Sequence, residues 1–533
     1  MDSAPENSAP ESRANASGRP ANQRPERAER GRRAWTGKRH KFRARTRWPL
    51  LGICLIMSAF GSATTSMAAA AKPSAEQCDE VPTGVAASNH FLTFRMPPGL
   101  MPDPQFNRRP ARIQVHRVRP VYANGRCPGV TNRAAVLIHG RVQPGPAVFD
   151  LRHPAPEGGQ LSAQEGLARA GIDTFAPSLL GYGRSTRFET GLDDPGNASL
   201  RPFNVDGSCS WPEGCDRTHL PAVFPLDRQG ELLLTNPLGG QRRPHSSNVR
   251  FARTDVWVRD IRQVIDDAIA RAQPTDGKVT LIGYSLGAER VGRTLYAANP
   301  VLAGSAEVIA KVNRTVFLSP IFGGPTEETT PPGGFATFPL HVTPFTTAAA
   351  GTWLMPPARE AACTGHVIPG SPEQFAAQLR QQETVGREWG GDAPDNPTGL
   401  TRSPTFSSYG WNTTVAGQLT PPTLVVQGFE DLGVPGGVAN SSAIFNALPA
   451  SMTNKALVQV RCASHALHLE GCSGPRCTPQ SGTPYGGRPG EPWAGPHATL
   501  KAALTEWIKN GTFNGATNGR FTVDESGVAS ASP

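Results

Sequence analysis

The stretch from Lys278 to Ala288 has the sequence KVTLIGYSLGA. Its β-branched and aliphatic first half predicts a short strand, and the residues after it predict a tight turn that leads into a helix. The turn has the pattern G-x-S-x-G, in which Gly283 and Gly287 leave room for a strained backbone at Ser285. Such a turn would lift the Ser285 hydroxyl above the edge of the sheet, beside a helix N-terminus that favours negative charge.

A five-residue pattern of this kind also arises by chance in a chain that contains 57 glycines. The assignment therefore depends on other segments, of which the first is the apolar run Ala134–Ile138. A continuous apolar run of this length predicts a central parallel strand that is buried on both faces. It ends in His139, Gly140 and Arg141.

An acidic residue and a histidine follow two later apolar segments. The segment Thr423–Gly428 leads to Asp431, and the segment Ala456–Val460 leads to His465. Both segments predict buried strands, and parallel strands place the residues that follow them at one edge of the sheet.

Together these segments resemble the α/β-hydrolase family, which has a G-x-S-x-G turn between a strand and a helix and the chain order Ser, Asp, His. The resemblance covers about residues 85–510. It implies the fold class α/β, with a mostly parallel central sheet flanked by helices and an inserted cap or lid. In this family a strand ending in His-Gly lies at the oxyanion hole, and His139 is expected only to brace its loop.

The resemblance also implies a role for each residue of the candidate site. Ser285 would be the nucleophile, His465 the base that takes its proton, and Asp431 the acid that holds the imidazole in the right tautomer. The main-chain N–H groups of Arg141 and Leu286 would form the oxyanion hole.

Two neighbouring residues are rivals for the acid and the base. Glu430 directly precedes Asp431 and would point the other way at the strand end. His468 lies three residues beyond His465. We favour His465 because a small residue precedes it and the acidic Glu470 follows five residues later, as the family pattern requires.

Two insertions interrupt the predicted sheet, at residues 186–250 and 321–420. The first is rich in Pro, Gly, Asp and Arg, and we expect it to cover a sheet edge or to border the site. The second is expected to be the cap or lid, with one amphipathic helix at about Pro372–Arg387, and residues 511–533 are expected to be a flexible tail. Apolar residues of the cap would either line a substrate pocket or seal the cap onto the core: Phe335, Phe338, Phe345, Trp353, Leu354 and Met355.

The N-terminus differs in composition from the rest of the chain. Residues 1–48 hold 13 Lys and Arg against 5 Asp and Glu, a local charge of +8, and predict a disordered basic extension. Residues 49–71 are uncharged, begin apolar and end in small residues, which is typical of a signal peptide cleaved near Ala69–Ala71. The alternative is a membrane anchor. Without these segments only +2 of the net charge of +10 remains, so nucleic-acid binding is not expected.

The cysteine count agrees with export from the cytoplasm, to the cell exterior or the periplasm. Of nine cysteines, Cys54 lies in the apolar segment, and an even number remains for disulfides. Proximity in the sequence favours the pairs Cys209–Cys215 and Cys472–Cys477. The remaining four cysteines would then form Cys78–Cys127 and Cys363–Cys462. No C-x-x-C pattern suggests zinc, and we expect neither a metal nor a cofactor.

The expected function is therefore that of an exported serine hydrolase that cleaves carboxylic esters through an acyl-enzyme. Its partner would be a small ester or lipid-like substrate. Three alternatives stay open: an exocellular peptidase of the proline-aminopeptidase kind, an acyltransferase, and a non-catalytic binding module with the same fold.

Overall fold

The computed structural model describes the following residues of the chain: 81–101, 104–123, 133–186, 252–296, 305–326, 342–345, 349, 351–383, 400–402, 406–407, 409–434 and 436–532. The predictions for residues 1–48 and 49–71, and nearly all of the insertion 186–250, lie outside the described residues. So do the expected pairs Cys78–Cys127 and Cys209–Cys215.

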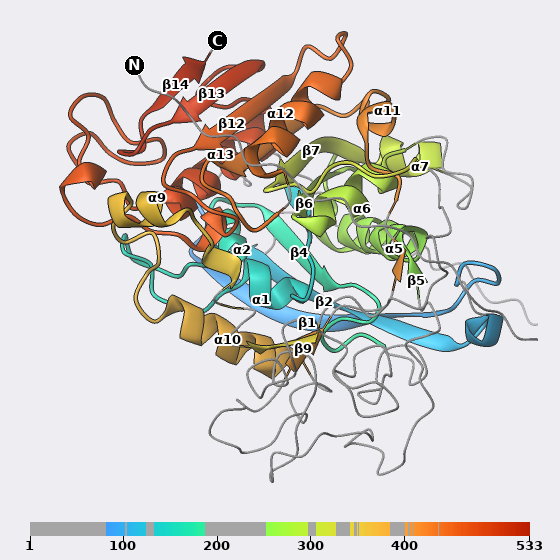
Figure 1. Ribbon diagram of the computed structural model, residues 1–533. Coiled ribbons are helices and arrows are strands. Elements are labelled where there is room, and N and C mark those ends of the chain that lie inside the picture. The colour runs from blue at the N-terminus through green and yellow to red at the C-terminus, as the bar shows by residue number, and fades with distance from the viewer. Residues whose placement is uncertain are drawn as a thin grey trace, which may run out of the picture. The chain divides into compact units, whose positions relative to one another are not determined.

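Within the described part of the chain, ten strands form one sheet in the order β1-β2-β4-β3-β6-β7-β11-β12-β13-β14 (Figure 1). Neighbouring strands from β4 to β13 are parallel, and the pairs at both edges are antiparallel. The protein therefore has the predicted α/β-hydrolase fold. The strands are β1 (Gly84–Arg95), β2 (Pro110–Val121), β3 (Ala134–Ile138), β4 (Asp173–Ser178), β6 (Val279–Tyr284), β7 (Val312–Leu318), β11 (Thr423–Gly428), β12 (Lys455–Val460), β13 (Gly519–Val523) and β14 (Ala529–Ser532).

The helices lie on both faces of this sheet, and four short strands form two small sheets of their own. The helices are α1 (Gly145–Phe149), α2 (Ala163–Arg169), α5 (Thr254–Ala272), α6 (Leu286–Thr294), α7 (Ser305–Ala310), α9 (Pro357–Ala362), α10 (Ser371–Gln382), α11 (Thr413–Ala416), α12 (Gly437–Ala447) and α13 (Pro496–Asn510). Short 3₁₀ helices occur at Pro104–Phe106, Gly351–Trp353, Leu467–Leu469 and Pro475–Cys477. The small sheets pair β5 (Ala252–Arg253) with β10 (Phe406–Ser407) and β8 (Val342–Pro344) with β9 (Leu400–Arg402).

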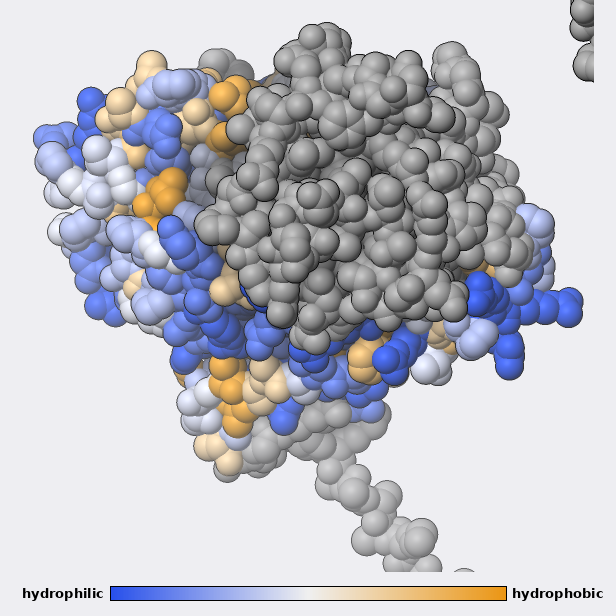
Figure 2. All heavy atoms as spheres, turned by 60° about the horizontal axis from the view of Figure 1, so that its bottom comes forward, coloured by the Kyte–Doolittle hydropathy of each residue, from blue (hydrophilic) through white to orange (hydrophobic). Residues whose placement is uncertain are grey.

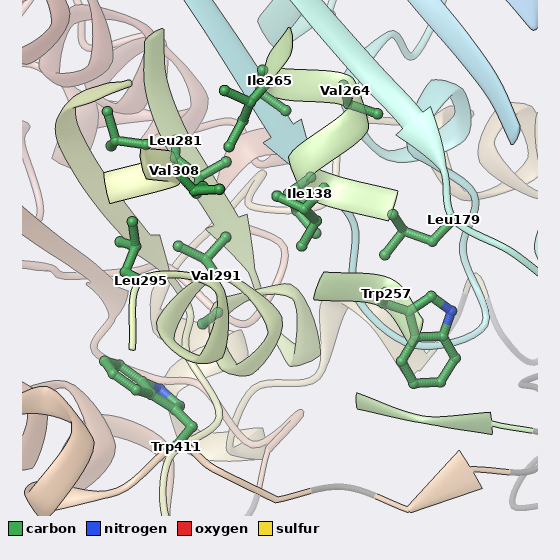
Figure 3. Packing of buried hydrophobic residues seen from close by; sticks show 14 of the residues in the cluster. Ile138, Leu179, Trp257, Val264, Ile265, Leu281, Val291, Leu295, Val308 and Trp411 are labelled. Carbon is green, nitrogen blue, oxygen red and sulfur yellow. The ribbon is translucent and has the colours of Figure 1, made fainter. Parts of the chain in front are cut away.

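The central strands are apolar throughout because both of their faces are covered. In β3, Val136 and Ile138 belong to the hydrophobic cluster that contains α5 and α6, whereas Ala135 and Leu137 belong to the cluster that contains α2 and α13. Successive side chains of a strand point to opposite faces, so one strand serves both clusters. Figure 3 shows part of the first cluster, whose members include Ile138 of β3, Ile265 of α5 and Val291 of α6.

The C-terminal residues correct one prediction. Residues 511–533 were expected to be a flexible tail, but β13 pairs with β12 and β14 pairs with β13, so the domain continues to the end of β14. Phe521 and Val523 alternate inward and are buried in the core. Asp524 closes the hairpin, because its Oδ1 accepts hydrogen bonds from the backbone N–H groups of Ser526 and Val528 at 2.8 and 2.9 Å.

The insertion at residues 321–420 differs in two respects from the cap that the sequence predicts. Its amphipathic helix, expected at about Pro372–Arg387, is α10 and ends at Gln382. Its last part belongs to the main core, because Trp411 is fully buried there and an added Cβ at Gly292 of α6 would lie 2.1 Å from the Trp411 ring.

Two of the expected disulfides are confirmed. Cys363 in the insertion is bonded to Cys462, which follows β12, and Cys472 is bonded to Cys477.

The described surface in Figure 2 is largely hydrophilic, with small separate hydrophobic patches. Four large hydrophobic side chains of the described residues are exposed: Val81, Phe91, Leu354 and Leu432. None of the helices in the described ranges combines the length and the apolar character that crossing a bilayer requires.

Candidate active site

The turn between β6 and α6 has the strained backbone that its sequence predicts. Ser285 has φ 54° and ψ −123°, a conformation that a residue with a side chain rarely adopts. The flanking glycines are needed for packing. An added Cβ at Gly283 would lie 2.6 Å from the carbonyl oxygen of Gly287, and one at Gly287 would lie 2.3 Å from the carbonyl oxygen of Ile138. The backbone at the end of β6 therefore packs closely against the start of α6, and the start of α6 packs closely against the end of β3.

The loop after β3 lies directly against Ser285. An added Cβ at Gly140 would be 2.9 Å from the Ser285 Cβ and 3.2 Å from its Oγ. Arg141 follows Gly140 in this loop, and Leu286 follows Ser285 as the first residue of α6. The two main-chain donors predicted for the oxyanion hole therefore belong to two segments that meet at the serine.

The side chain of His139 is fully engaged with the backbone. Its Nδ1–H donates to the Gly140 carbonyl oxygen at 2.8 Å, and its Nε2 accepts from the Leu179 N–H at 3.1 Å. Burial, aided by the charge of Arg290, holds the pKa of His139 well below its usual range, so the imidazole stays neutral. This arrangement fixes the loop that carries Gly140 and leaves neither ring nitrogen free for chemistry.

Asp431 and His465 meet at the same edge of the sheet. His465 Nδ1 lies 2.9 Å from Asp431 Oδ2, which also accepts a hydrogen bond from Gln427 Nε2 at 2.6 Å. The other carboxyl oxygen, Oδ1, accepts from the Gly433 N–H at 2.7 Å. The carboxyl group thus has three donors, which fix its orientation.

Among the described residues no hydrogen bond joins Ser285 Oγ to the imidazole of His465. The ring of Tyr284, which directly precedes Ser285, lies 5.1 Å from that of His465 between centroids. Catalytic hydrogen bonds of this kind are often long or poorly aligned in proteins without substrate.

The two rival residues lie in different surroundings. Glu430 forms an ion pair with Arg359 at 2.9 Å. His468 is buried beside the rings of Phe149 and Tyr284, with centroid distances of 6.2 and 4.7 Å. Burial, aided by His465, lowers the pKa of His468 to about 3. Its neutral, enclosed ring has the properties of a core residue.

Two residues that support the site were not assigned a role by the sequence. Gln427 is a buried polar residue that follows the apolar residues Leu424 to Val426 near the end of β11. A polar residue in such a buried run is the sequence signal that could have indicated its supporting role. Glu470 entered the prediction only as part of a pattern. Its carboxyl group accepts a hydrogen bond from the Ser464 N–H at 2.8 Å and a second one from the Ser464 hydroxyl. Ser464 directly precedes His465.

The apolar residues expected in the cap have mixed positions. Phe345 and Trp353 are buried in a cluster with core residues, and Met355 is buried beside the Cys363–Cys462 disulfide. Leu354 differs, because 47% of its side chain is exposed and its carbonyl oxygen accepts a hydrogen bond from the Leu432 N–H at 3.4 Å. Phe335 and Phe338 lie outside the described residues.

No grouping of three or more His, Cys, Asp or Glu side chains suited to a metal ion occurs among the residues that the structure describes.

Comparison with known proteins gives matches among solved structures alone. No family model and no curated protein matches the sequence. A thioesterase domain from the curacin biosynthetic pathway is 16% identical, covers 72% of this chain and 95% of its own, and has a TM-score of 0.35. A bromoperoxidase from Bacillus anthracis is 13% identical, with 67% and 90% covered and a TM-score of 0.33. A serine hydrolase from the polyaromatic-hydrocarbon-degrading Cycloclasticus zankles is 13% identical, with 72% and 93% covered and a TM-score of 0.33. Such identities carry no activity across to this chain.

Proposed function

We propose that the protein is an exported serine hydrolase that cleaves carboxylic esters through an acyl-enzyme. The observation that carries the proposal is the hydrogen bond between Asp431 and His465, at the sheet edge where the strained turn presents Ser285. A packing role alone gives no reason for a serine in a strained conformation beside a histidine that an acid orients. Strain of this kind occurs preferentially at functional sites.

In the proposed reaction, Ser285 Oγ attacks the carbonyl carbon of the ester while His465 Nε2 takes its proton. Asp431 keeps the other proton on Nδ1, so that Nε2 is the basic nitrogen, and stabilises the imidazolium ion that forms. His465 then gives the proton to the leaving alcohol, and the acyl group stays on Ser285. A water molecule, activated by His465 in the same way, releases the acid and regenerates the serine.

The carbonyl oxygen becomes negatively charged in each tetrahedral intermediate. We assign its stabilisation to the main-chain N–H groups of Arg141 and Leu286, on the two segments that meet at Ser285. Each such donor lowers the barrier by about 3–4 kcal/mol in enzymes where it has been removed.

Apolar acyl groups fit the surroundings of this site. Leu432 lies between Asp431 and Gly433, and an added Cβ at Gly433 would be 2.6 Å from the Cβ of His465. The side chain of Leu432 is 56% exposed, and it neighbours the exposed Leu354 of the insertion. A small or lipid-like ester could bury both leucines on binding. The proposed location outside the cytoplasm is supported by the Cys363–Cys462 and Cys472–Cys477 disulfides.

Hydrolysis of p-nitrophenyl esters of increasing acyl length by the purified protein tests the proposal. Ser285→Ala is expected to lower kcat by at least about 1,000-fold, because the nucleophile is lost. Ser530→Ala in the exposed strand β14 is the matched control and is expected to hydrolyse esters like the wild type.

Three outcomes would contradict this assignment. A wild-type protein that hydrolyses no ester, and is indistinguishable from Ser285→Ala, would overturn the enzyme assignment in favour of a binding module. Hydrolysis of amino-acyl anilides but not esters would favour the peptidase. Transfer of the acyl group to an added alcohol in preference to water would favour the acyltransferase.

A further inference from the structure

One short segment of the insertion runs along the loop that carries His465. We call residues 363–368 the strap. It lies between α9 and α10 and is covalently attached through Cys363 to Cys462, which lies three residues before His465. This disulfide joins positions that are 99 residues apart in the chain.

The strap is also attached beyond His465. Val367 and Glu470 form an antiparallel bridge, and the Gly471 N–H donates to the His366 carbonyl oxygen at 3.0 Å. Glu470 lies five residues after His465. The loop is therefore held by the strap on both sides of the histidine, by a disulfide before it and by backbone pairing after it.

The far end of this pairing is close-packed. The Ser473 N–H donates to the Thr364 carbonyl oxygen at 3.0 Å, and the Thr364 hydroxyl donates to the Ser473 carbonyl oxygen at 2.6 Å. Gly365 has φ 72°, and an added Cβ there would lie 2.2 Å from the Ser473 Oγ. A residue with a side chain would not fit between the two segments.

Glu470 connects the strap to the residue next to the imidazole. Its backbone pairs with Val367, while its fully buried carboxyl group accepts hydrogen bonds from the N–H and hydroxyl of Ser464. A displacement of the strap would therefore move Ser464 and with it the backbone of His465.

We infer that the strap holds His465 in the position required for catalysis, and that Cys363, Cys462 and Glu470 are positioning residues for the reaction. The inference rests on the function proposed above. It also means that the insertion, at this end, is not a lid that opens independently of the catalytic histidine. A displacement of about 1 Å in a catalytic group costs up to about 100-fold in rate.

Removal of the Cys363–Cys462 disulfide tests the inference. The double variant Cys363→Ser/Cys462→Ser is expected to lower kcat for ester hydrolysis by about 10–100-fold with KM changed less than twofold, because the loop loses its attachment before His465. The rate at which a fluorophosphonate modifies Ser285 is expected to fall in parallel, since that reaction also needs the histidine. The control is Ser530→Ala in β14, which contacts neither this disulfide nor the strap and is expected to keep both rates.

A second pair of variants leaves the disulfides intact, in case the double variant does not fold. Glu470→Ala removes both hydrogen bonds to Ser464 and is expected to lower kcat by at least about tenfold, whereas Glu470→Gln, which keeps an acceptor and a donor there, is expected to restore most of it. Equal kcat values for Glu470→Ala and Glu470→Gln, or a folded Cys363→Ser/Cys462→Ser protein with the kcat of the wild type, would overturn the inference while ester hydrolysis by the wild type upholds the proposed function. An inactive wild-type protein would overturn both.

Discussion

At the scale of single residues, identical side chains acquire different properties from their surroundings. His465 is hydrogen-bonded to Asp431, whereas His468, three positions away, is enclosed among aromatic rings with a pKa near 3. Asp431 has three hydrogen-bond donors, of which one is His465, while Glu430 beside it has Arg359. Sequence spacing favoured Asp431 over Glu430 and His465 over His468, and the physical difference within each pair is one of burial and partners.

The two adjacent carboxylates give a direct test of this difference. Asp431→Asn is expected to lower kcat by about 10³–10⁴-fold, because an amide favours the wrong tautomer of His465 and does not stabilise its charged form. Glu430→Gln weakens only the pair with Arg359 and is expected to stay within about threefold of the wild type. Steady-state ester hydrolysis by both proteins measures this, and equal losses would remove Asp431 from the proposed role.

A second residue-scale prediction concerns the dependence of stability on pH. Burial raises the pKa of Glu470 from 4.5 to about 8, against the opposing hydrogen bonds from Ser464. Between these values the unfolded chain releases a proton that the folded protein keeps, so this carboxyl group destabilises the fold progressively as pH rises from about 4.5 to 8. The slope is at most about 1.4 kcal/mol per pH unit.

Glu470→Gln removes this titration while keeping the hydrogen bonds. We therefore expect the free energy of unfolding of Glu470→Gln, minus that of the wild type, to increase as pH rises from 5 to 8. Urea denaturation of both proteins measures this difference. Glu491→Gln at an exposed position is expected to follow the wild type throughout. Parallel curves for Glu470→Gln and the wild type would mean that Glu470 is ionised in the folded protein over the whole range.

At the scale of elements, the sequence predicted the central strands and the turn well because their signals are local. Ala134–Ile138 is a continuous apolar run, and β3 has those same bounds; β11 lies within the segment that begins at Pro422 and leads to Asp431. Gly283 and Gly287 are required by contacts of 2.3–2.6 Å around one turn. The strands β13 and β14 were missed, because β13 pairs with β12, which lies far away in the sequence, and β14 in turn pairs with β13.

The C-terminal strands give the element-scale prediction. Phe521 of β13 is 6% exposed and lies 5.0 Å from the ring of Phe513, so Phe521→Ala is expected to lower the free energy of unfolding by about 3 kcal/mol. Phe91→Ala in the edge strand β1 is the control, because that side chain is 40% exposed, and it is expected to cost less than about 1 kcal/mol. Urea denaturation measures both. Equal small losses would fit the frayed tail that the sequence predicted instead.

At the scale of the whole described domain, the insertion is joined to the catalytic edge of the sheet rather than simply placed over it. Its apolar residues Phe345 and Trp353 are buried with core side chains, and its strap brackets the His465 loop. The sequence predicted the Cys363–Cys462 pair only because these cysteines were left over once nearer cysteines had been paired. The structure confirms this pair and adds the backbone pairing of the strap with Glu470 and Gly471 on the other side of His465.

The sequence by itself predicted the central apolar strands, the strained turn at Ser285 and the candidate partners Asp431 and His465, because side-chain periodicity and backbone sterics act over a few neighbouring residues. The tertiary structure alone decided that Gln427 supports Asp431, that Glu470 holds Ser464, and that the strap lies along the histidine loop. These contacts join segments that approach only when the chain folds, and the pKa values of His468 and Glu470 depend on the burial that results.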